Sequence, residues 1–258
     1  MDSTIEHPSG PKASRGGSKA PRHRLTFPNL LNPRDLGGYA TVDGGLTRTH
    51  SLLRTDDLWK LTPQGVQELL GYGVKAVIDL RWPHELAARP SVFQRGVDGV
   101  RYTNVSLLDG TEAAWVAKSP GVPKERWNCT VLDLCQPEMA LALRTVADAP
   151  DGTVLFHCAA GKDRTGVIAS MLLAVADVEP GEIAEDYAIS SDYIREAYLA
   201  AHPPERWPAV LEDVRCPPEQ VYNMLEHLES RYGGVMAYLR RIGLSEGEID
   251  RMRSRLRS

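Results

Sequence analysis

The residues with the clearest chemistry lie in one short segment that runs from Val154 to Gly166. An apolar stretch typical of a strand ends at Cys158, a short loop follows, and Arg164 stands six positions after the cysteine. An apolar, helix-like stretch begins at Gly166. A loop that leads into a helix N-terminus points several backbone N–H groups at one spot, where the helix dipole adds positive charge. The spacing therefore predicts a cradle for a phosphate beside a nucleophilic sulfur.

The thiol of Cys158 is the predicted nucleophile. We expect it to be a thiolate at neutral pH, because a helix N-terminus and nearby cations stabilise a charged sulfur. Arg164 can hold two phosphate oxygens as a bidentate fork, and Gly161 suits a position that needs positive φ. The hydroxyl of Thr165 could donate a hydrogen bond to the thiolate. In-line attack on phosphorus would give a phosphocysteine, which water then hydrolyses.

The wall of this cradle is expected to come from the residues after the cysteine. They are Ala159, Ala160, Gly161, Lys162, Thr165 and Gly166. Lys162 adds a second cation that could contact an extra phosphate, the alternative being a solvent-facing lysine. His157 is expected to orient the loop through hydrogen bonds. A lone cysteine is usually a small core residue, but that interpretation does not explain these residue types together at a strand-to-helix junction.

The segment His-Cys-x-x-Gly-Lys-Asp-Arg-Thr-Gly at 157–166 resembles the signature loop of the cysteine-dependent phosphatases, His-Cys-x5-Arg-[Ser/Thr]. Its Lys-Asp pair is similar to that of the bacterial atypical tyrosine/dual-specificity phosphatases, a branch that also cleaves phosphoinositides. Further blocks resemble that branch at 32–39, at 53–58, at 77–81 with the following Glu85, and at 232–244. The resemblance implies a protein-tyrosine phosphatase that uses no cofactor and no metal. Its implied substrate is a phosphorylated protein or a phosphoinositide.

The general acid that protonates the leaving group has two candidates. Asp163 lies inside the phosphate loop, and Asp109 follows a predicted strand at 102–108, where dual-specificity phosphatases place their acid. The resemblance favours Asp163 and therefore a catalytic set of Cys158, Asp163 and Arg164. The alternatives are a salt bridge from Asp163 to a neighbouring cation of the loop, and a simple turn residue at Asp109.

Polar residues outside the loop are expected to support the site as hydrogen-bonded or paired groups. These are Arg34, Asp35, Asp79 and Arg81, with Arg54 as a weaker candidate. The Trp-Pro-His sequence at 82–84 resembles the Trp-Pro-Asp loop that carries the acid in many cysteine phosphatases. It follows the wrong strand for that loop, so we interpret the likeness as a coincidence.

The elements that must position the loop alternate between strands and helices along the first part of the chain. Strands are predicted at 74–80, 102–108 and 154–158, and helices at 62–72, 137–147 and 166–176. After residue 180 the sequence favours helices alone, at 181–200, 217–231, 233–242 and 245–257. This order is typical of an α/β fold with a largely parallel central sheet flanked by helices and a helical C-terminal part. Such folds bind ligands at the carboxyl ends of their strands.

The 258 residues, of which 42% are hydrophobic, suffice for one phosphatase domain at 25–258 behind a disordered tail at 1–24. Two irregular, tryptophan-containing segments at 110–136 and 200–217 are candidates for a helical lid, the alternative being ordinary packing on the core. The net charge of −4 gives no reason to expect a nucleic-acid partner. The oligomeric state is not predicted.

Four cysteines are too few for a disulfide scaffold, and Cys129, Cys135 and Cys216 lack metal-ligand spacing. No apolar segment is long enough to insert stably into a membrane, and no apolar signal core is visible at the N-terminus. We therefore expect a cytoplasmic protein, with export by a signal-less route left open.

Three other functions use similar groups. A small-metabolite phosphatase for nucleotides, sugars or inositol phosphates would have identical loop chemistry. A non-catalytic phospholigand-binding module would use the same cradle with a defective acid, but Cys158, Asp163 and Arg164 are all intact. A rhodanese-type sulfurtransferase would not need Arg164, so it ranks last.

Overall fold

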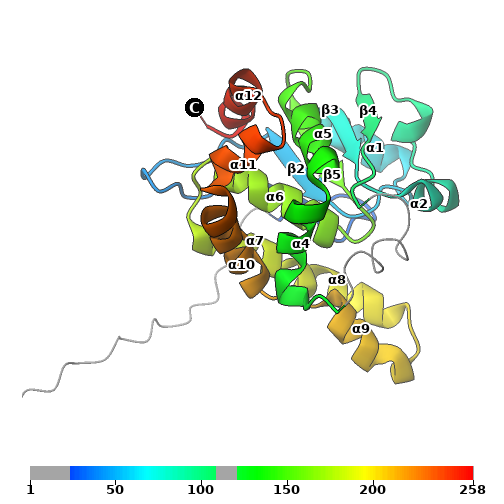
Figure 1. Ribbon diagram of the computed structural model, residues 1–258. Coiled ribbons are helices and arrows are strands. Elements are labelled where there is room, and N and C mark those ends of the chain that lie inside the picture. The colour runs from blue at the N-terminus through cyan, green and yellow to red at the C-terminus, as the bar shows by residue number, and fades with distance from the viewer. Residues whose placement is uncertain (1–23, 109–120, 258) are drawn as a thin grey trace, which may run out of the picture.

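A five-stranded sheet lies at the centre of the computed structural model, which describes residues 24–108 and 121–257 (Figure 1). The strands are β1 (Arg34–Asp35), β2 (Leu52–Thr55), β3 (Val74–Asp79), β4 (Arg101–Asn104) and β5 (Thr153–His157). Their spatial order is β1-β2-β5-β3-β4, with β1 antiparallel to β2 and the other pairs parallel. The predicted α/β fold with a largely parallel sheet is confirmed. Because β5 is central, its carboxyl end places Cys158 in the middle of one sheet edge.

Helices cover both faces of the sheet. They are α1 (Pro63–Gly71), α2 (Pro83–Ala88), α4 (Trp127–Leu134), α5 (Gln136–Ala147), α6 (Asp163–Val175), α7 (Pro180–Ala188), α8 (Ser190–Ala200), α9 (Trp207–Val214), α10 (Glu219–His227), α11 (Val235–Arg241) and α12 (Glu246–Leu256). Val154 and Phe156 of β5 pack into a large core with α5 and α6, whereas Leu155 packs on the other face with Leu69 of α1. This alternation is the period of two that a β-strand imposes.

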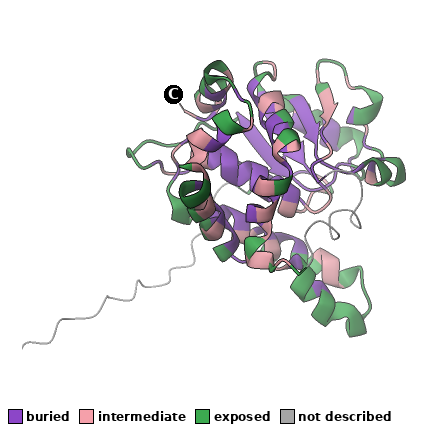
Figure 2. Cartoon of the chain, viewed as in Figure 1, coloured by how far each residue is buried: buried purple, intermediate pink, exposed green. Residues whose placement is uncertain are grey.

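The predicted phosphate loop spans residues 158–165, and its last three residues form the start of helix α6. This helix is buried on almost every side (Figure 2). It begins at Asp163, three residues before the predicted start at Gly166, because Asp163 to Thr165 already form its first turn. The predicted ends of α1 are confirmed. The Thr62 hydroxyl accepts a hydrogen bond from the Gly65 amide at 3.2 Å, and Gly73 follows the helix with φ of +101°.

The segments expected to be irregular contain helices. In 110–136 the chain forms α4 over Trp127–Leu134, and in 200–217 it forms α9 over Trp207–Val214. Helix α9 forms because Val210 and Val214, one turn apart, bury their side chains against Ile194 of α8. The single helix expected at 181–200 is two helices that meet at Ile189. The strand expected at 102–108 ends at Asn104.

Helices α8 and α9 extend as a pair away from the sheet and are largely exposed (Figures 1 and 2). Trp207 at the start of α9 is 41% exposed, and its indole N–H reaches the carbonyls of Leu199 and His202, each at 3.1 Å. The predicted tail, apart from Arg24, lies outside the described residues, as does the 110–120 part of the first lid candidate. None of the helices in the described ranges has the length and apolar character that a bilayer crossing requires.

Candidate active site

The loop after β5 turns its first two carbonyl groups toward the body of the protein. The imidazole Nδ1–H of His157 donates to the Cys158 carbonyl at 3.1 Å. The amide of Asp57, just beyond β2, donates to the Ala159 carbonyl at 3.1 Å. The predicted role of His157 in orienting the loop therefore has a direct contact, and Asp57 adds a second that the sequence did not reveal.

The next two carbonyls are held by side chains from the N-terminal part of the chain. The amide nitrogen of Asn32 donates to the Ala160 carbonyl at 3.2 Å and to the Gly161 carbonyl at 3.0 Å. The Arg54 guanidinium also donates to the Gly161 carbonyl, at 2.8 Å. Four successive carbonyls of the loop thus point outward, each toward a donor from behind.

The amide groups of 159–162 consequently point to the other side. All described peptide bonds are trans, and in a trans peptide the N–H is directed opposite to the C=O of the same unit. Across the described ranges, none of these four amides donates to a protein acceptor. Together with the first turn of α6 they form a concave set of donors, which is a typical binding site for an oxyanion.

Gly161 allows this shape. Its φ is +67°, a left-handed conformation that side chains disfavour. A Cβ at this position would lie 2.5 Å from the carbonyl oxygen of Thr55. The predicted need for glycine therefore arises from both the backbone angle and the close approach of β2.

Arg164 is held in place by Glu85, from α2. Its Nη1 and Nη2 atoms lie 2.6 Å and 2.9 Å from the two carboxylate oxygens of Glu85. Burial alone would raise the pKa of Glu85, but the Arg164 guanidinium outweighs it and the pKa lies below its usual value. A guanidinium has five N–H donors, and Nη1 also donates to the Leu80 carbonyl at 3.4 Å, so Nε–H and one Nη2 hydrogen are left for a phosphate.

The indole of Trp82 supports the same guanidinium. The central carbon of Arg164 lies 4.6 Å from the centre of the Trp82 ring, and the indole N–H donates to the Leu108 carbonyl at 2.7 Å. The 82–84 segment therefore contributes an aromatic surface that packs against the Arg164 guanidinium.

Lys162 is not the solvent-facing residue of the alternative interpretation, since only 4% of it is exposed. Its ammonium lies 2.9 Å from Asp163 Oδ2 and donates to the Asp213 carbonyl, in α9, at 2.7 Å. Burial would lower the pKa of Lys162, but the nearby charges of Asp163 and others raise it above its usual value. The salt bridge left open for Asp163 therefore exists, and Asp163 keeps 35% of its side chain exposed.

The remaining predicted residues differ in what the structure shows of them. Cys158 is 3% exposed directly after β5. The Thr165 hydroxyl is buried with no partner in the described part of the chain, so its expected hydrogen bond to the Cys158 sulfur is not formed. A Cβ on Gly166 would lie 2.7 Å from the Tyr187 ring, so this glycine brings α6 close to α7. The alternative acid, Asp109, lies outside the described residues.

Asp79 organises the supporting groups behind His157. It receives the Arg81 guanidinium at 2.7 Å and the Tyr102 hydroxyl at 3.0 Å, and the Nε2 atom of His157 lies 3.4 Å away without hydrogen-bond geometry. Burial alone would raise the pKa of Asp79, but His157 and Arg81 hold it well below its usual range. Arg81 continues to Asp57 at 2.9 Å. The expected supporting roles of Asp79 and Arg81 thus have a physical basis.

A second buried centre lies at Asp186, which the sequence analysis did not single out. Arg34 Nε lies 2.9 Å from one carboxylate oxygen of Asp186 and Arg54 Nη1 lies 2.5 Å from the other. Burial would raise the pKa of Asp186, but the two arginines keep it well below its usual range. Because Arg54 also bonds Gly161, this network reaches the phosphate loop directly.

Asp35 has a different role from the one expected. Its carboxylate accepts hydrogen bonds from the amides of Gly37 and His50, each at 2.7 Å, and from the Tyr72 hydroxyl. None of these partners belongs to the phosphate loop. Asp35 therefore stabilises the turn between β1 and β2 at the amino end of the sheet.

Four residues of this site were not predicted as supports: Asn32, Asp57, Glu85 and Asp186. The first three lie in blocks that resemble the phosphatase branch, which is the only sequence signal they carry. Within the described ranges, no group of three or more histidine, cysteine, aspartate or glutamate residues could hold a metal ion.

The fold and the arrangement of this loop agree with the phosphatase class that the comparisons show. Residues 25–258 match the profile of the tyrosine phosphatase family, and the chain belongs to that family. A tyrosine-protein phosphatase of Nostoc commune is 38% identical over 224 residues, which cover 80% of this chain and 74% of the relative. The triple specificity protein phosphatase PtpB of Mycobacterium tuberculosis is 25% identical, with 88% of this chain and 96% of PtpB covered.

Among solved structures, TpbA of P. aeruginosa in complex with pTyr is similar, with a TM-score of 0.40 and 17% identity. This likeness covers 80% of this chain and 98% of TpbA.

Proposed function

We propose that this protein is a cysteine-dependent protein-tyrosine phosphatase. The observation that carries the proposal is the outward orientation of four successive carbonyls in the loop after Cys158, which leaves the amides of 159–162 facing one concave side. Arg164, held by Glu85, supplies the bidentate cation for the same phosphate. Membership of the tyrosine phosphatase family supports phosphotyrosine as the substrate.

In the first step the Cys158 sulfur attacks phosphorus, the P–S bond forms and the P–O bond to tyrosine breaks. The leaving oxygen takes a proton, for which Asp163 is the proposed donor because it begins α6 beside the cradle and remains partly exposed. In the second step water attacks phosphorus, gives its proton to the same carboxylate, and the P–S bond breaks. Inorganic phosphate and the free thiolate result, so the enzyme is regenerated.

The hydrogen-bond partners of Lys162 affect whether the site can bind substrates with a second phosphate, such as the phosphoinositides that the family resemblance implies. Its ammonium is bound to Asp163 and to the Asp213 carbonyl, so a second phosphate would have to replace one of these partners. This favours a monophosphorylated protein over a phosphoinositide or an inositol phosphate. Phosphoserine, phosphothreonine and phosphoinositides belong in the same activity panel as direct comparisons.

The test is the Cys158→Ser variant, assayed with p-nitrophenyl phosphate and a phosphotyrosine peptide. We expect turnover to fall by at least about a thousandfold, because the nucleophile is lost. Phosphate binding should persist, because the amides and Arg164 remain. Rapid quenching of the wild-type enzyme with a radiolabelled substrate should trap a phosphoprotein that the variant lacks. Turnover retained by Cys158→Ser would refute the mechanism.

A further inference from the structure

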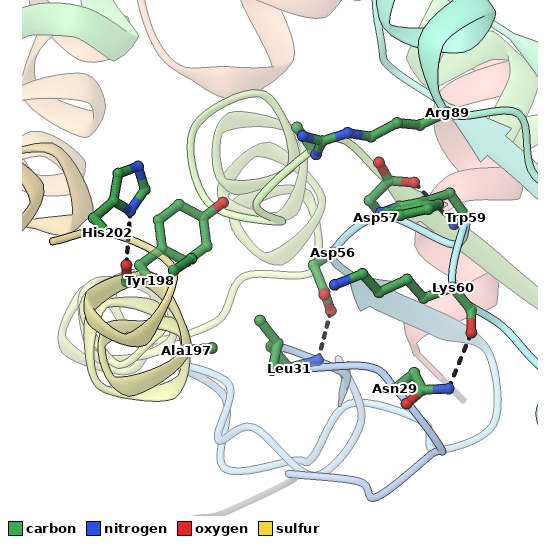
Figure 3. A pocket seen from close by; sticks show the side chains of 12 residues that line it. Asn29, Leu31, Asp56, Asp57, Trp59, Lys60, Arg89, Ala197, Tyr198 and His202 are labelled. Atoms are coloured by element: carbon green, nitrogen blue, oxygen red, sulfur yellow. Dashed lines mark hydrogen bonds between the residues drawn. The ribbon is translucent and has the colours of Figure 1, made fainter.

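A cleft of about 490 Å³ lies directly beside the phosphate loop (Figure 3). Ala159, the residue after the nucleophile, forms part of its wall, and Trp59, Lys60 and Arg89 form another part. Tyr198 of α8 lines it from the opposite side (Figure 3). Because the cleft and the cradle share Ala159, a substrate whose phosphate fills the cradle has neighbouring atoms within reach of the cleft.

Two cations line the cleft around one indole. The Lys60 ammonium lies 5.2 Å and the Arg89 guanidinium carbon 5.7 Å from the centre of the Trp59 ring. Figure 3 shows both side chains extending from the Trp59 side into the cleft. Neither of them pairs with a carboxylate anywhere in 24–108 or 121–257. Both are therefore free to bind an anion that enters from outside.

The two acids in the same wall are engaged elsewhere. Asp57 accepts the Arg81 guanidinium at 2.9 Å and the Trp59 amide at 3.0 Å. Asp56 Oδ1 accepts the amides of Leu31 and Asn32 at 2.9 Å and 3.0 Å. Oδ1 of each acid is thus occupied within the protein, and both acids are buried, at 6% and 7% exposure. The lysine and arginine side chains that line the cleft are Lys60 and Arg89.

Helix α2 fixes the distance between this cationic wall and the cradle. Glu85, in α2, holds the phosphate-binding Arg164, and Arg89 follows the same helix directly. The Arg81 guanidinium also donates to the Arg89 carbonyl at 2.8 Å. One short, anchored segment therefore positions both the cradle arginine and the cation of the cleft.

The opposite wall is mainly apolar. Leu31, Ala197 and Ala201 contribute alkyl groups, and Tyr198 contributes its ring. Burial, then the nearby charge of Cys158, raises the pKa of Tyr198 to about 12, so its hydroxyl stays neutral. An apolar wall suits the methylene groups and backbone of a peptide better than the hydroxyls of an inositol ring, which need hydrogen-bond partners.

We propose that this cleft is a specificity subsite for an acidic residue that flanks the phosphotyrosine of a peptide substrate. The inference rests on the proposed phosphatase function and adds the class of sequence that the site selects. Lys60 and Arg89 bind the carboxylate of the flanking residue, and Trp59 with the apolar wall contacts its methylene groups.

The experiment measures kcat/KM for a set of phosphotyrosine peptides in which one glutamate is moved along both flanks, together with the glutamine counterparts. We expect the glutamate peptide to be preferred roughly fivefold at one flanking position, the size expected from two partly solvated ion pairs. The Lys60→Gln/Arg89→Gln double variant should bring that ratio to about one. The Lys60→Glu/Arg89→Glu variant should favour a lysine peptide instead. Lys75→Gln, at an exposed site on the amino end of β3, is the matched control and should keep the wild-type ratio.

Each outcome has a distinct meaning, because the ratio between two peptides does not depend on how much enzyme is active. An enzyme that hydrolyses p-nitrophenyl phosphate but shows a ratio of one at every position would overturn the subsite and leave the phosphatase function standing. The same holds if the charge-reversed variant keeps the wild-type preference, or if a phosphoinositide and not a peptide depends on Lys60 and Arg89. Failure of the wild-type enzyme on p-nitrophenyl phosphate would overturn the proposed function itself.

Discussion

Replacing Glu85 with glutamine tests whether the cradle arginine works only when it is held from behind. Both terminal nitrogens of Arg164 bond Glu85, at 2.6 Å and 2.9 Å, and the two side chains are 10% and 19% exposed. Glutamine keeps the shape of the side chain and an acceptor for the Trp82 amide, which Glu85 now receives at 2.8 Å. The substitution therefore removes the charge while it leaves the start of α2 capped.

The expected loss follows from the two hydrogen bonds. A hydrogen bond to a charged group contributes about 1.5–3 kcal/mol and a neutral one about 0.5–1.5 kcal/mol. The glutamine oxygen can still accept from one terminal nitrogen of Arg164, but the bond is weaker without the negative charge, and the second bond is lost because the glutamine amide nitrogen is a donor. With a discount for the partial exposure of the pair, the guanidinium is held about 1–2 kcal/mol less firmly. If the whole of this loss of about 1–2 kcal/mol raises the free energy of the transition state, kcat/KM falls roughly 5- to 30-fold.

The assay is steady-state hydrolysis of p-nitrophenyl phosphate together with inhibition by vanadate, in wild type, Glu85→Gln and the control Glu68→Gln. Glu68 is a half-buried residue of α1, far in sequence from the loop, whose carboxylate accepts a hydrogen bond from Gln64, so its variant should behave as wild type. A Glu85→Gln enzyme whose kcat/KM and vanadate affinity both stay within twofold of wild type would refute the reasoning.

The pH dependence of the same pair gives a second readout. The pKa of Glu85 is lowered from 4.5, because Arg164 outweighs the opposing effect of burial. A group with a depressed folded-state pKa stabilises the site above its ordinary value and loses that contribution as pH falls through the depressed value. The difference between wild type and Glu85→Gln should therefore be constant above pH 4.5 and shrink below it.

Three further predictions concern the loop and its support. Gly161→Ala should lower kcat/KM at least about tenfold, because its Cβ would lie 2.5 Å from a backbone oxygen of Thr55. Gly181→Ala, where a Cβ meets nothing within 4 Å, should leave kcat/KM unchanged. Asp186→Asn should lower the free energy of unfolding by about 3–5 kcal/mol in a urea titration, because it leaves two buried arginines without their counter-ion; a loss below 1 kcal/mol contradicts this. Asp163→Asn should remove the proton-dependent limb from the pH–rate profile of kcat, and loss of that limb in Asp109→Asn alone would transfer the acid role.

The sequence was sufficient for the type of fold and for the position of Cys158 directly after a central strand, because both depend on local patterns. The apolar run before Cys158 and the apolar helix after it are short-range signals, and their alternation with earlier strands indicated the parallel sheet. The buried ion pairs were not predictable in this way. Asp186 meets Arg34 and Arg54 across separations of 152 and 132 residues, and no local pattern encodes such contacts.

The second lid candidate also depends on a contact that the local sequence does not encode. The 200–217 segment contains several prolines, so its sequence favoured an irregular interpretation. Its helix α9 depends on two valines that pack on α8, a tertiary contact that overrides weak local propensity. The buried ammonium of Lys162 donates a hydrogen bond to the Asp213 carbonyl near the end of α9. This bond links the helix to the phosphate loop.

The shape of the phosphate cradle is determined mainly by residues that point away from the phosphate. Asn32 and Arg54 bind the outer sides of the Ala160 and Gly161 peptide groups, and their sequence separations from Gly161 are 129 and 107 residues. The side chains of the loop itself can therefore differ while the amides keep their direction. Ala159 shows what such a change in side chain could affect, because Ala159 forms part of the wall of the neighbouring cleft. A larger residue there would leave the amide orientation intact, since Asp57 holds the Ala159 carbonyl, but would narrow the passage between cradle and cleft. If both proposals hold, catalysis depends on Cys158 and access to the cleft depends on its neighbour Ala159, so substitutions at Ala159 should change substrate preference more than the rate with p-nitrophenyl phosphate.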